Sequence, residues 1–292
     1  PVDRRQRQMC IRDSKKTMRE FKFIKMNGLG NDFVIIDQRK NTISLSKKDI
    51  VSVCDRDDGV GCDQLINILP RQDGGNILIE FFNSNGEEIH ACGNGSRCVA
   101  DLLMSEENVD SIKLSTKEKT ISCQRIGDNC VSIDMGIPNF ELKKIPVKTD
   151  IDLNSLNFQI NNQVLANPFF VNVGNPHVIF FVNEISDYRI EEIGPVIEND
   201  LIFPEKINVS LCKIVNKELI DLVVWERGAG KTLACGTAAC AAAVAAVTNN
   251  HVSEKIQVRL PGGILDINYS KGKTVVMSGP TEINFNGEYK IN

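Results

Sequence analysis

Two cysteines, Cys92 and Cys235, each come directly before a segment that favours an α-helix. The segments read CGNGSRCVADLLM and CGTAACAAAVAAVTNN, and both are rich in good helix formers after a first turn that begins with Gly and Asn or Thr. A helix N-terminus presents unpaired N–H groups and about half a positive charge. We therefore expect both thiols to ionise more readily than an ordinary cysteine.

Two such thiols that meet in one cleft could invert a carbon stereocentre. Inversion through a proton needs a base on one face of the carbon and an acid on the other, and a thiolate and a thiol exchange these roles after each turnover. A redox disulfide and two inert, buried helix cysteines are the alternatives that the residue pattern leaves open. The deeper thiols Cys98 and Cys240 are interpreted as packing residues.

The GAGKT sequence at 228–232 is not a phosphate-binding loop. The Walker pattern G-x-x-x-x-G-K-[ST] requires a glycine at the position of Trp225. The helix of a Walker loop also starts at the lysine, whereas the alanine-rich segment here starts at Cys235, four residues after Lys231. The functional interest of this segment is therefore the thiol of Cys235 and not a bound phosphate.

The chain contains an internal repeat, which predicts the positions of both thiols. GNDFVII at 30–36 is matched by GNPHVIF at 174–180, and ACGN at 91–94 is matched by ACGT at 234–237, at spacings of 144 and 143 residues. In each half, apolar strands with turn signals surround one long helix. We predict an α+β protein of two pseudo-symmetric domains, each a curved mixed or antiparallel sheet wrapped around a central helix.

The same reading sets the domain boundaries. We expect residues 1–20 to be a disordered or extraneous segment, 21–136 to form the N-terminal domain and 137–280 the C-terminal domain. Residues 138–167 are polar and weakly patterned, and they contain the connection between the domains.

Composition excludes several classes of protein. The formal net charge is −4, whereas a nucleic-acid-binding surface would be basic. No segment approaches the roughly 18 apolar residues of a membrane helix, and the basic N-terminal segment lacks the apolar core of a signal peptide. We therefore predict a cytoplasmic protein that binds neither nucleic acid nor membrane. With no C-x-x-C pair and only three histidines, we predict no metal site.

Six motifs carry a resemblance to a known family. MNGLGNDFVIID, GVGCDQL, FFNSNGEEIHACGNGSRC, VGNPHVIF, FPEKINV and ERGAGKTLACGTAAC occur in this order. Together they closely resemble the diaminopimelate epimerases, from about residue 21 to the C-terminus. The resemblance implies reversible conversion of LL-2,6-diaminoheptanedioate to its meso form, in lysine and peptidoglycan precursor synthesis, without pyridoxal phosphate or any other cofactor. It also implies that residues 281–292 form a strand that returns to the first domain. A homodimer is a possible state of assembly, since dimers are common among members of the family.

The resemblance further implies a set of site residues. Cys92 and Cys235 would be the acid–base pair, with His177 and Glu226 supporting proton transfer. The helix starts Gly93–Asn94 and Gly236–Thr237 would hold the reacting carboxylate. The other expected substrate-binding residues are amides and a charged pair, namely Asn31, Gln64, Asn83, Asn175, Asn208, Glu226 and Arg227.

Three other functions compete with this one. A proline racemase or hydroxyproline epimerase-like isomerase shares the two-cysteine chemistry, but its first cysteine is usually followed by Gly and His, and Asn94 stands here in place of that His. A thiol redox protein and a noncatalytic binding module are the others. Lys231 stands where the family often has an acidic residue, and its charge is hypothesised to favour a thiolate at Cys235.

Overall fold

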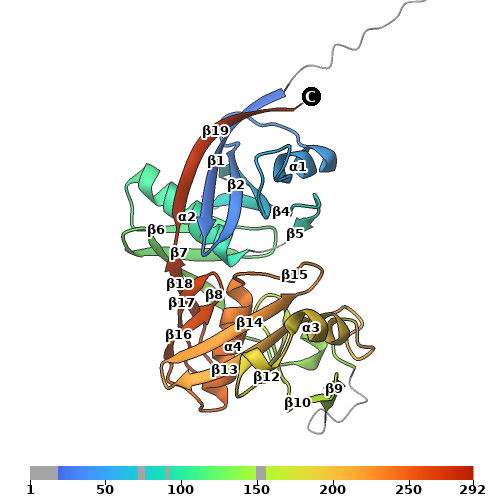
Figure 1. Cartoon of the computed structure of the whole chain (residues 1–292). Helices are drawn as coiled ribbons and strands as arrows, with labels where there is room; N and C mark the ends of the chain where they lie inside the picture. Colours follow the sequence, from blue (N-terminus) through green and yellow to red (C-terminus); the bar gives the residue numbers. More distant parts are fainter. Residues whose placement is uncertain (1–18, 72–75, 90–91, 149–155, 292) are drawn as a thin grey trace, which may run out of the picture.

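The computed structural model describes residues 19–71, 76–89, 92–148 and 156–291 (Figure 1). Residues 1–18, most of the predicted extraneous segment, lie outside the described residues. Arg19 and Glu20 already belong to the first strand, where they pair with Ile291 and Lys290. The first strand therefore includes two residues that the sequence analysis assigned to that segment.

The described residues of the first half form eight strands and two helices. Ser46 and Asp49 form a capping box that starts the first helix. The strands alternate between buried and exposed residues where one face is solvated, as in TISCQRIG. The elements are β1 (Arg19–Gly28), β2 (Asn31–Asp37), α1 (Lys47–Cys54), β3 (Gln64–Arg71), β4 (Ile77–Asn83), β5 (Glu88–Ile89), α2 (Gly93–Glu107), β6 (Ser111–Ser115), β7 (Thr120–Gly127) and β8 (Cys130–Gly136).

The second half repeats this plan after a short connection. Its elements are the 3₁₀ helix η1 (Leu142–Lys144), β9 (Asn157–Ile160), β10 (Gln163–Ala166), β11 (Phe169–Asn172), β12 (Pro176–Phe181), the 3₁₀ helix η3 (Ile185–Asp187), α3 (Ile190–Glu198), β13 (Asn208–Asn216), β14 (Leu219–Glu226), β15 (Gly230–Lys231), α4 (Gly236–Thr248), β16 (Lys255–Leu260), β17 (Gly263–Asn268), β18 (Val275–Pro280) and β19 (Glu282–Ile291).

The order of strand pairing is the same in both halves. In the first half β1 pairs antiparallel with β2, β2 parallel with β3, β3 antiparallel with β4 and β4 parallel with β6. In the second half β11, β12, β13, β14 and β16 pair with the same succession of directions. Both halves close with two antiparallel pairings, β6–β7–β8 and β16–β17–β18. The predicted α+β class with two pseudo-symmetric, sheet-dominated halves is confirmed.

Two features join the halves. β8 pairs antiparallel with β18, so the sheets are continuous across the junction. β19 leaves β18 and pairs along the whole of β1, and Figure 1 shows it crossing from the lower lobe to the upper one. The C-terminal strand thus lies against the first half, while the exact division at residue 136 stays a prediction.

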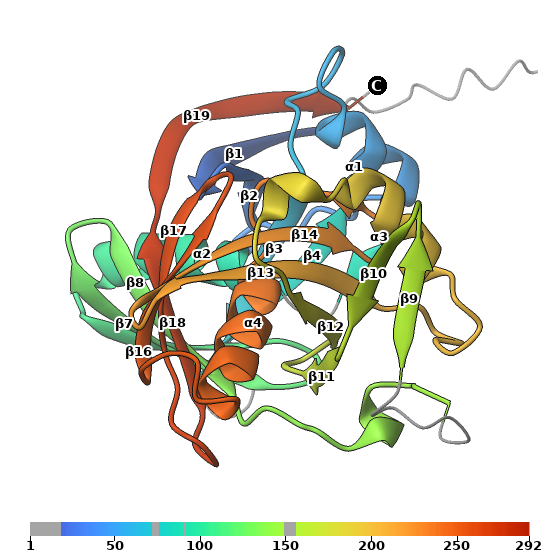
Figure 2. The same cartoon turned by 60° about the horizontal axis from the view of Figure 1, so that its bottom comes forward.

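Each half packs its sheet around one buried helix. α2 contacts β1, β6, β7 and β8, and α4 contacts β11 to β14 and β16 to β18. Figure 2 shows α4 surrounded by these strands. The alanines of α4 are almost all fully buried, because their small side chains let strands approach the helix from every side. The described residues contain no helix both long and apolar enough to span a membrane.

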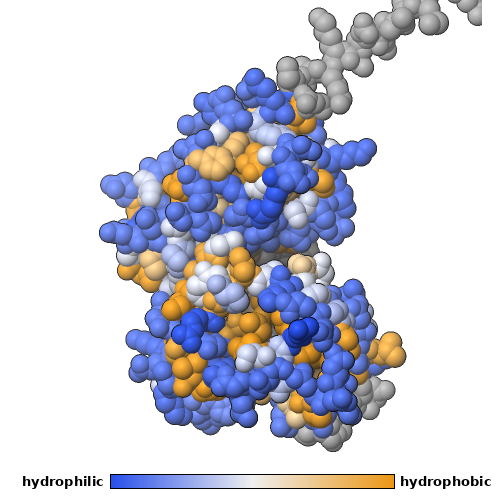
Figure 3. Space-filling view, viewed as in Figure 1, coloured by the Kyte–Doolittle hydropathy of each residue, from blue (hydrophilic) through white to orange (hydrophobic). Residues whose placement is uncertain are grey.

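The connection between the halves contains more structure than its polar sequence suggests. β9 and β10 pair as a hairpin, and Phe158, Ile160 and Leu165 are buried in a second core under α3. Phe158 and Ile160 alternate with polar residues, and Asn161 and Asn162 form a two-residue turn with positive φ. Each strand is only four residues long, so this hairpin signal is short within a polar segment. Elsewhere the surface is largely hydrophilic on the face in Figure 3, with hydrophobic residues gathered near the junction of the lobes and on the lower lobe.

Buried thiols of the core should make the protein sensitive to alkaline pH. Burial raises the pKa of Cys123 on β7 to about 12, whereas the unfolded thiol ionises near about 8.5. Between these values only the unfolded state loses the proton, so stability is full below pH 8.5 and falls as pH rises. We expect Cys123→Val to remove about 1.4 kcal/mol of this loss per pH unit in urea titrations between pH 9 and 11.

A matched variant separates the thiol from general packing. Val131 on β8 is equally buried and carries no titratable group. Val131→Ala should lower stability at every pH and keep the wild-type slope. An unchanged slope in Cys123→Val would contradict the prediction.

Candidate active site

Both predicted cysteines are the N-cap residues of the central helices. Cys92 has extended backbone angles, and its Sγ accepts a hydrogen bond from the backbone N–H of Gly95 at 3.3 Å. Cys235 stands at the same position of α4, with its Sγ 3.4 Å from the hydroxyl of Thr237. The predicted helix starts are confirmed, and each thiol lies beside unpaired N–H groups of a helix N-terminus.

The two helix N-termini meet at one place between the lobes. A Cβ added to Gly93 would lie 2.7 Å from Met277 Cε, and one added to Gly236 would lie 3.0 Å from the same atom. The Gly236 position is also 3.2 Å from Asn94 Oδ1. Both helix starts therefore pack against the side chain of Met277, which a residue larger than glycine at either position would have to displace. The two helix starts that follow Cys92 and Cys235 consequently lie close together.

A tight turn brings Asn31 to Cys92. Leu29 and Gly30, with φ of 64° and 78°, form the two-residue loop between β1 and β2. Asn31 Oδ1 lies 4.0 Å from Cys92 Sγ and 3.4 Å from Asn94 Nδ2. The Asn31 amide nitrogen donates to Asp63 at 2.8 Å, which fixes the orientation of the amide.

Glu226 lies against the second thiol. Cys235 Sγ donates to Glu226 Oε2 at 3.1 Å, and Thr232 Oγ1 donates to Oε1 at 2.5 Å. Burial raises the pKa of the Glu226 carboxyl, and the bonds from Thr232 and Cys235 oppose this shift. The arrangement places a proton acceptor directly on the thiol.

The expectation that the thiols ionise readily is wrong for this conformation. Burial raises the pKa of Cys92 to about 12, against the lowering effect of the Gly95 N–H, and the charge of Glu226 adds to the rise. Burial followed by the Glu226 carboxylate also raises the pKa of Cys235. Removal of water outweighs the helix N-terminus here. Because Glu226 acts on both sulfurs, the two thiols share one electrostatic environment.

The structure gives no support to the hypothesis that Lys231 favours the Cys235 thiolate. Lys231 Nζ forms an ion pair with Glu191 Oε1 on α3 at 2.5 Å. The groups that shift the pKa of Cys235 are burial, Glu226, Thr237 and the N–H of Ala238. A charge neutralised by its own partner at the surface has little effect on a buried thiol.

A second group of predicted residues surrounds His177. The ring is fully buried, its Nε2 lies 2.8 Å from Asn175 Oδ1, and burial followed by the charge of Arg227 lowers its pKa to about 3. His177 is therefore neutral at physiological pH. Asn208, its parallel neighbour on β13, donates to the carbonyl of Pro176 and accepts from the N–H of Arg227. Among the described contacts, neither thiol is hydrogen-bonded to His177.

The remaining predicted residues lie at strand ends. Gln64 at the start of β3 and Asn83 at the end of β4 face each other, with Gln64 Nε2 3.2 Å from Asn83 Oδ1. The Gln64 Oε1 atom is buried without a partner among the described residues. Arg227 is exposed, and its guanidinium donates to the carbonyl of Glu205. Both residues retain hydrogen-bonding capacity for a ligand.

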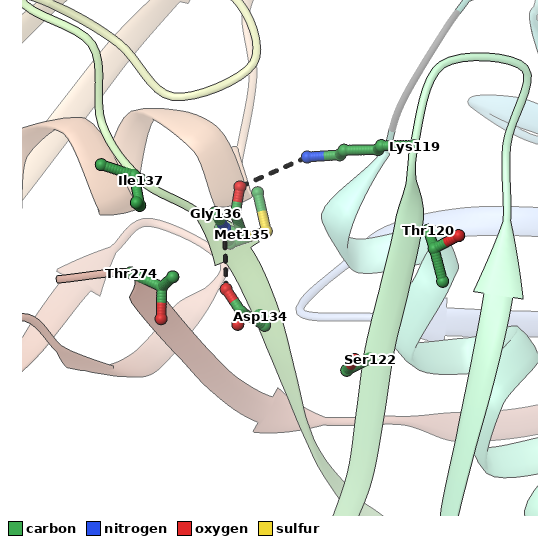
Figure 4. Close-up of a pocket in the computed structure, with 8 residues that line it drawn as sticks. All are labelled: Lys119, Thr120, Ser122, Asp134, Met135, Gly136, Ile137 and Thr274. Atoms are coloured by element: carbon green, nitrogen blue, oxygen red, sulfur yellow. Dashed lines mark hydrogen bonds between the residues drawn. The ribbon is translucent and has the colours of Figure 1, made fainter.

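Two pockets among the described residues are lined by neither thiol. One, of about 220 Å³, lies between β7, β8 and Thr274, where Lys119 donates to the carbonyl of Met135 (Figure 4). The other, of about 660 Å³, is lined by Asn27, Asp32, Leu233 and Phe285 among others, beside the turn that carries Asn31. The thiol region itself is closely packed in this conformation.

Sequence reasoning missed two residues of the site. Thr232 holds the Glu226 carboxylate, yet the sequence singles it out only as part of a failed Walker pattern. Met277 separates the two helix starts, and nothing in its local sequence marks it. Its position follows from the β8–β18 pairing, which no local pattern encodes.

The fold is one that solved structures of epimerases share. Among solved structures the fold is similar to a hydroxyproline epimerase from Agrobacterium vitis, with a TM-score of 0.67, 11% identity and coverage of 94% of this chain and 93% of that one. It is also similar to a phenazine biosynthesis protein of the PhzF family from Bacillus anthracis, with a TM-score of 0.63, 14% identity and coverage of 94% and 99%.

Comparison of the amino-acid sequence points to one particular family. The model of the diaminopimelate epimerase family matches residues 23–141 and 169–283. A diaminopimelate epimerase of Pelagibacter ubique is 46% identical over 264 residues, which cover 89% of this chain and 96% of the relative. One of Phenylobacterium zucineum is 40% identical over 268 residues, covering 91% and 96%. The chain belongs to the diaminopimelate epimerase family.

Proposed function

We propose that the protein epimerises LL-2,6-diaminoheptanedioate reversibly to the meso form, by proton transfer at Cα between Cys92 and Cys235. Membership of the family supports the substrate and its use in lysine and peptidoglycan precursor synthesis. The observation that carries the mechanism is the meeting of two helix N-termini at Met277, each capped by a cysteine. One thiol from each half can then flank a single carbon.

The reaction needs strong stabilisation of negative charge. The Cα–H of an amino acid is a far weaker acid than a thiol, so the carbanion must be held by donors already in place. The N–H groups at Gly93–Asn94 and Gly236–Thr237 belong to the first turns of α2 and α4, where they have no acceptor within the helix. We infer that they bind the reacting carboxylate and stabilise the charge that develops on it.

Proton movement at Cys235 involves Glu226. The thiol donates to the carboxylate at 3.1 Å, so the proton can pass to Glu226 and leave a thiolate beside a neutral acid. That thiolate removes Cα–H while the Cys92 thiol delivers a proton to the opposite face. In the reverse direction the roles exchange. His177, neutral and fully buried, orients Asn175 rather than carrying charge.

The non-reacting end of the substrate carries a second ammonium and a second carboxylate. Arg227 offers a bidentate cation for the carboxylate, and the amides of Asn31, Gln64 and Asn83 offer donors and acceptors. The proposed domains, 21–136 with 281–292 and 137–280, place one thiol in each lobe. Movement of the lobes would open the closely packed thiol region to substrate.

Inversion in deuterated water tests the proposal. We incubate LL-diaminopimelate with the protein in deuterium oxide and follow the α-carbon position by NMR. We expect the substrate to gain deuterium at Cα as it converts to the meso isomer. L-proline and trans-4-hydroxy-L-proline, the substrates of the competing isomerase function, should remain unchanged. Binding without exchange would indicate a binding module, and thiol–disulfide exchange without inversion a redox protein; either result would refute the epimerase.

Location and assembly remain proposals as well. The acidic balance of the chain supports a protein that does not bind nucleic acid. A cytoplasmic homodimer is the arrangement we propose, and cell fractionation and light scattering would test its two parts separately.

A further inference from the structure

Arg97, in the second turn of α2, is a fully buried cation. Its side chain is 0% exposed, and no carboxylate of the described residues lies within ion-pair distance of it. Its Nε and Nη2 atoms have no hydrogen-bond partner among the described residues. Burying a guanidinium without an acidic partner is costly, because water no longer solvates the charge.

The protein has built space for this side chain close to the thiols. A Cβ added to Gly28 on β1 would lie 3.3 Å from Arg97 Nη2, and one added to Gly279 on β18 would lie 3.2 Å from the same atom. Arg97 Nη1 lies 3.7 Å from Met277 Sδ, the residue between the two helix starts. Glycines on both sides thus leave room for a planar group at the point where the lobes meet.

The guanidinium sets the orientation of Asn94. Arg97 Nη1 donates to Asn94 Oδ1 at 3.0 Å, so the amide oxygen is occupied. The amide nitrogen must then point the other way, where it lies 3.4 Å from Asn31 Oδ1, beside Cys92. A reversed amide would place its N–H groups against a cation and present an acceptor to the site.

The ionisable groups facing Arg97 are almost all thiols. Cys92 and Cys98 on α2, Cys240 on α4 and Cys130 on β8 have the largest electrostatic effects on it after burial. Asp101, one turn further along α2, is engaged by Arg125 and Thr281. The charge of Arg97 lowers the pKa of Cys92 against the larger effect of burial. The cation therefore acts where negative charge would develop during proton transfer.

We propose that Arg97 is a positioning residue for epimerisation: it holds the Asn94 amide with its N–H groups toward the reacting carboxylate, and its buried charge offsets the negative charge on Cys92 and the substrate. This inference rests on the proposed function. It assigns to a residue outside the predicted site the task of compensating charge at the thiol of the first half.

The test compares Arg97→Met, which removes the charge, with Arg97→Lys, which keeps it. Alkylation of Cys92 by iodoacetamide, followed peptide by peptide by mass spectrometry across pH, reports thiolate formation without relying on activity. We expect alkylation of Cys92 at pH 8 to fall about 10-fold in Arg97→Met and about 3-fold or less in Arg97→Lys. The kcat for inversion should fall about 100-fold in Arg97→Met and about 10-fold in Arg97→Lys, and KM should change less than about 5-fold in either variant.

Arg125→Met is the matched control, because Arg125 also anchors α2 but makes its bonds to Asp101 and Ser105. It should lower thermal stability and leave the Cys92 profile unchanged. A wild-type Cys92 profile and kcat in folded Arg97→Met would overturn the proposal. If Arg97→Met does not fold, Arg97→Lys provides the test. Loss of both Cys92 alkylation and kcat in Arg97→Lys, to the level of a Cys92 variant, would show that the positive charge is not the property that supports the reaction. Absence of inversion in the wild-type chain refutes the function, and the alkylation profile still measures the effect of Arg97.

Discussion

Replacement of Cys92 or Cys235 by alanine is expected to lower kcat/KM for inversion of LL-diaminopimelate by about 10⁴-fold. In the proposed mechanism each half supplies one thiol, from helix starts that meet at Met277, and each stereoisomer presents its Cα–H to only one of them. A single remaining thiol can remove and return a proton on its own face but cannot deliver one to the opposite face. Chiral separation of the two isomers after timed incubation measures the loss.

The two variants should also differ from each other in deuterium oxide. One should incorporate deuterium slowly into the LL isomer and the other into the meso isomer, both without inversion, because each retains the thiol that faces a different isomer. The double variant should do neither. Cys98→Ala and Cys240→Ala remove buried thiols from the same helices and should cost stability with little loss of rate. Normal inversion by either single site variant would end the two-thiol mechanism.

Replacement of Glu226 by glutamine should lower kcat/KM about 10²- to 10³-fold at pH 7.5. An amide retains the shape of the carboxyl group and can still accept from Thr232 but cannot take the proton of Cys235. The Cys235 thiol, whose pKa burial raises, would then have to ionise without help. The residual rate of the variant should rise with pH as thiolate forms, and initial rates across pH 6 to 10 measure both effects.

Glu191→Gln is the matched control for Glu226→Gln. Glu191 lies nearby on α3 and pairs with Lys231 at the surface, so its replacement removes one negative charge without touching either thiol. The rate and its pH dependence should stay within about 2-fold of the wild type, because exposed charges are screened. A Glu226→Gln rate equal to that of Glu191→Gln would show that the carboxylate does not receive the thiol proton.

Local sequence was enough to predict the two helix starts and their equivalence. Gly with Asn or Thr at the start of each helix and Ala, Leu or Met after it specify a helix that begins at the cysteine. The repeat then predicts two alike halves, and the observed pairing order follows it. The β9–β10 hairpin was missed, because each of its strands is only four residues long in a polar segment and its burial depends on α3.

What the sequence by itself determined is therefore which residues begin the helices, and that the chain folds as two similar halves. Only the tertiary structure decided that Gly93 and Gly236 meet at Met277, that Glu226 binds Cys235, that Lys231 is paired elsewhere and that Arg97 is buried without an acid. Helix starts depend on immediate neighbours in the chain, whereas most of these contacts join residues far apart in it, and the Glu226–Cys235 contact requires the turn between β14 and α4. The pKa of each thiol depends on how completely packing removes water, and that is a property of the assembled fold alone.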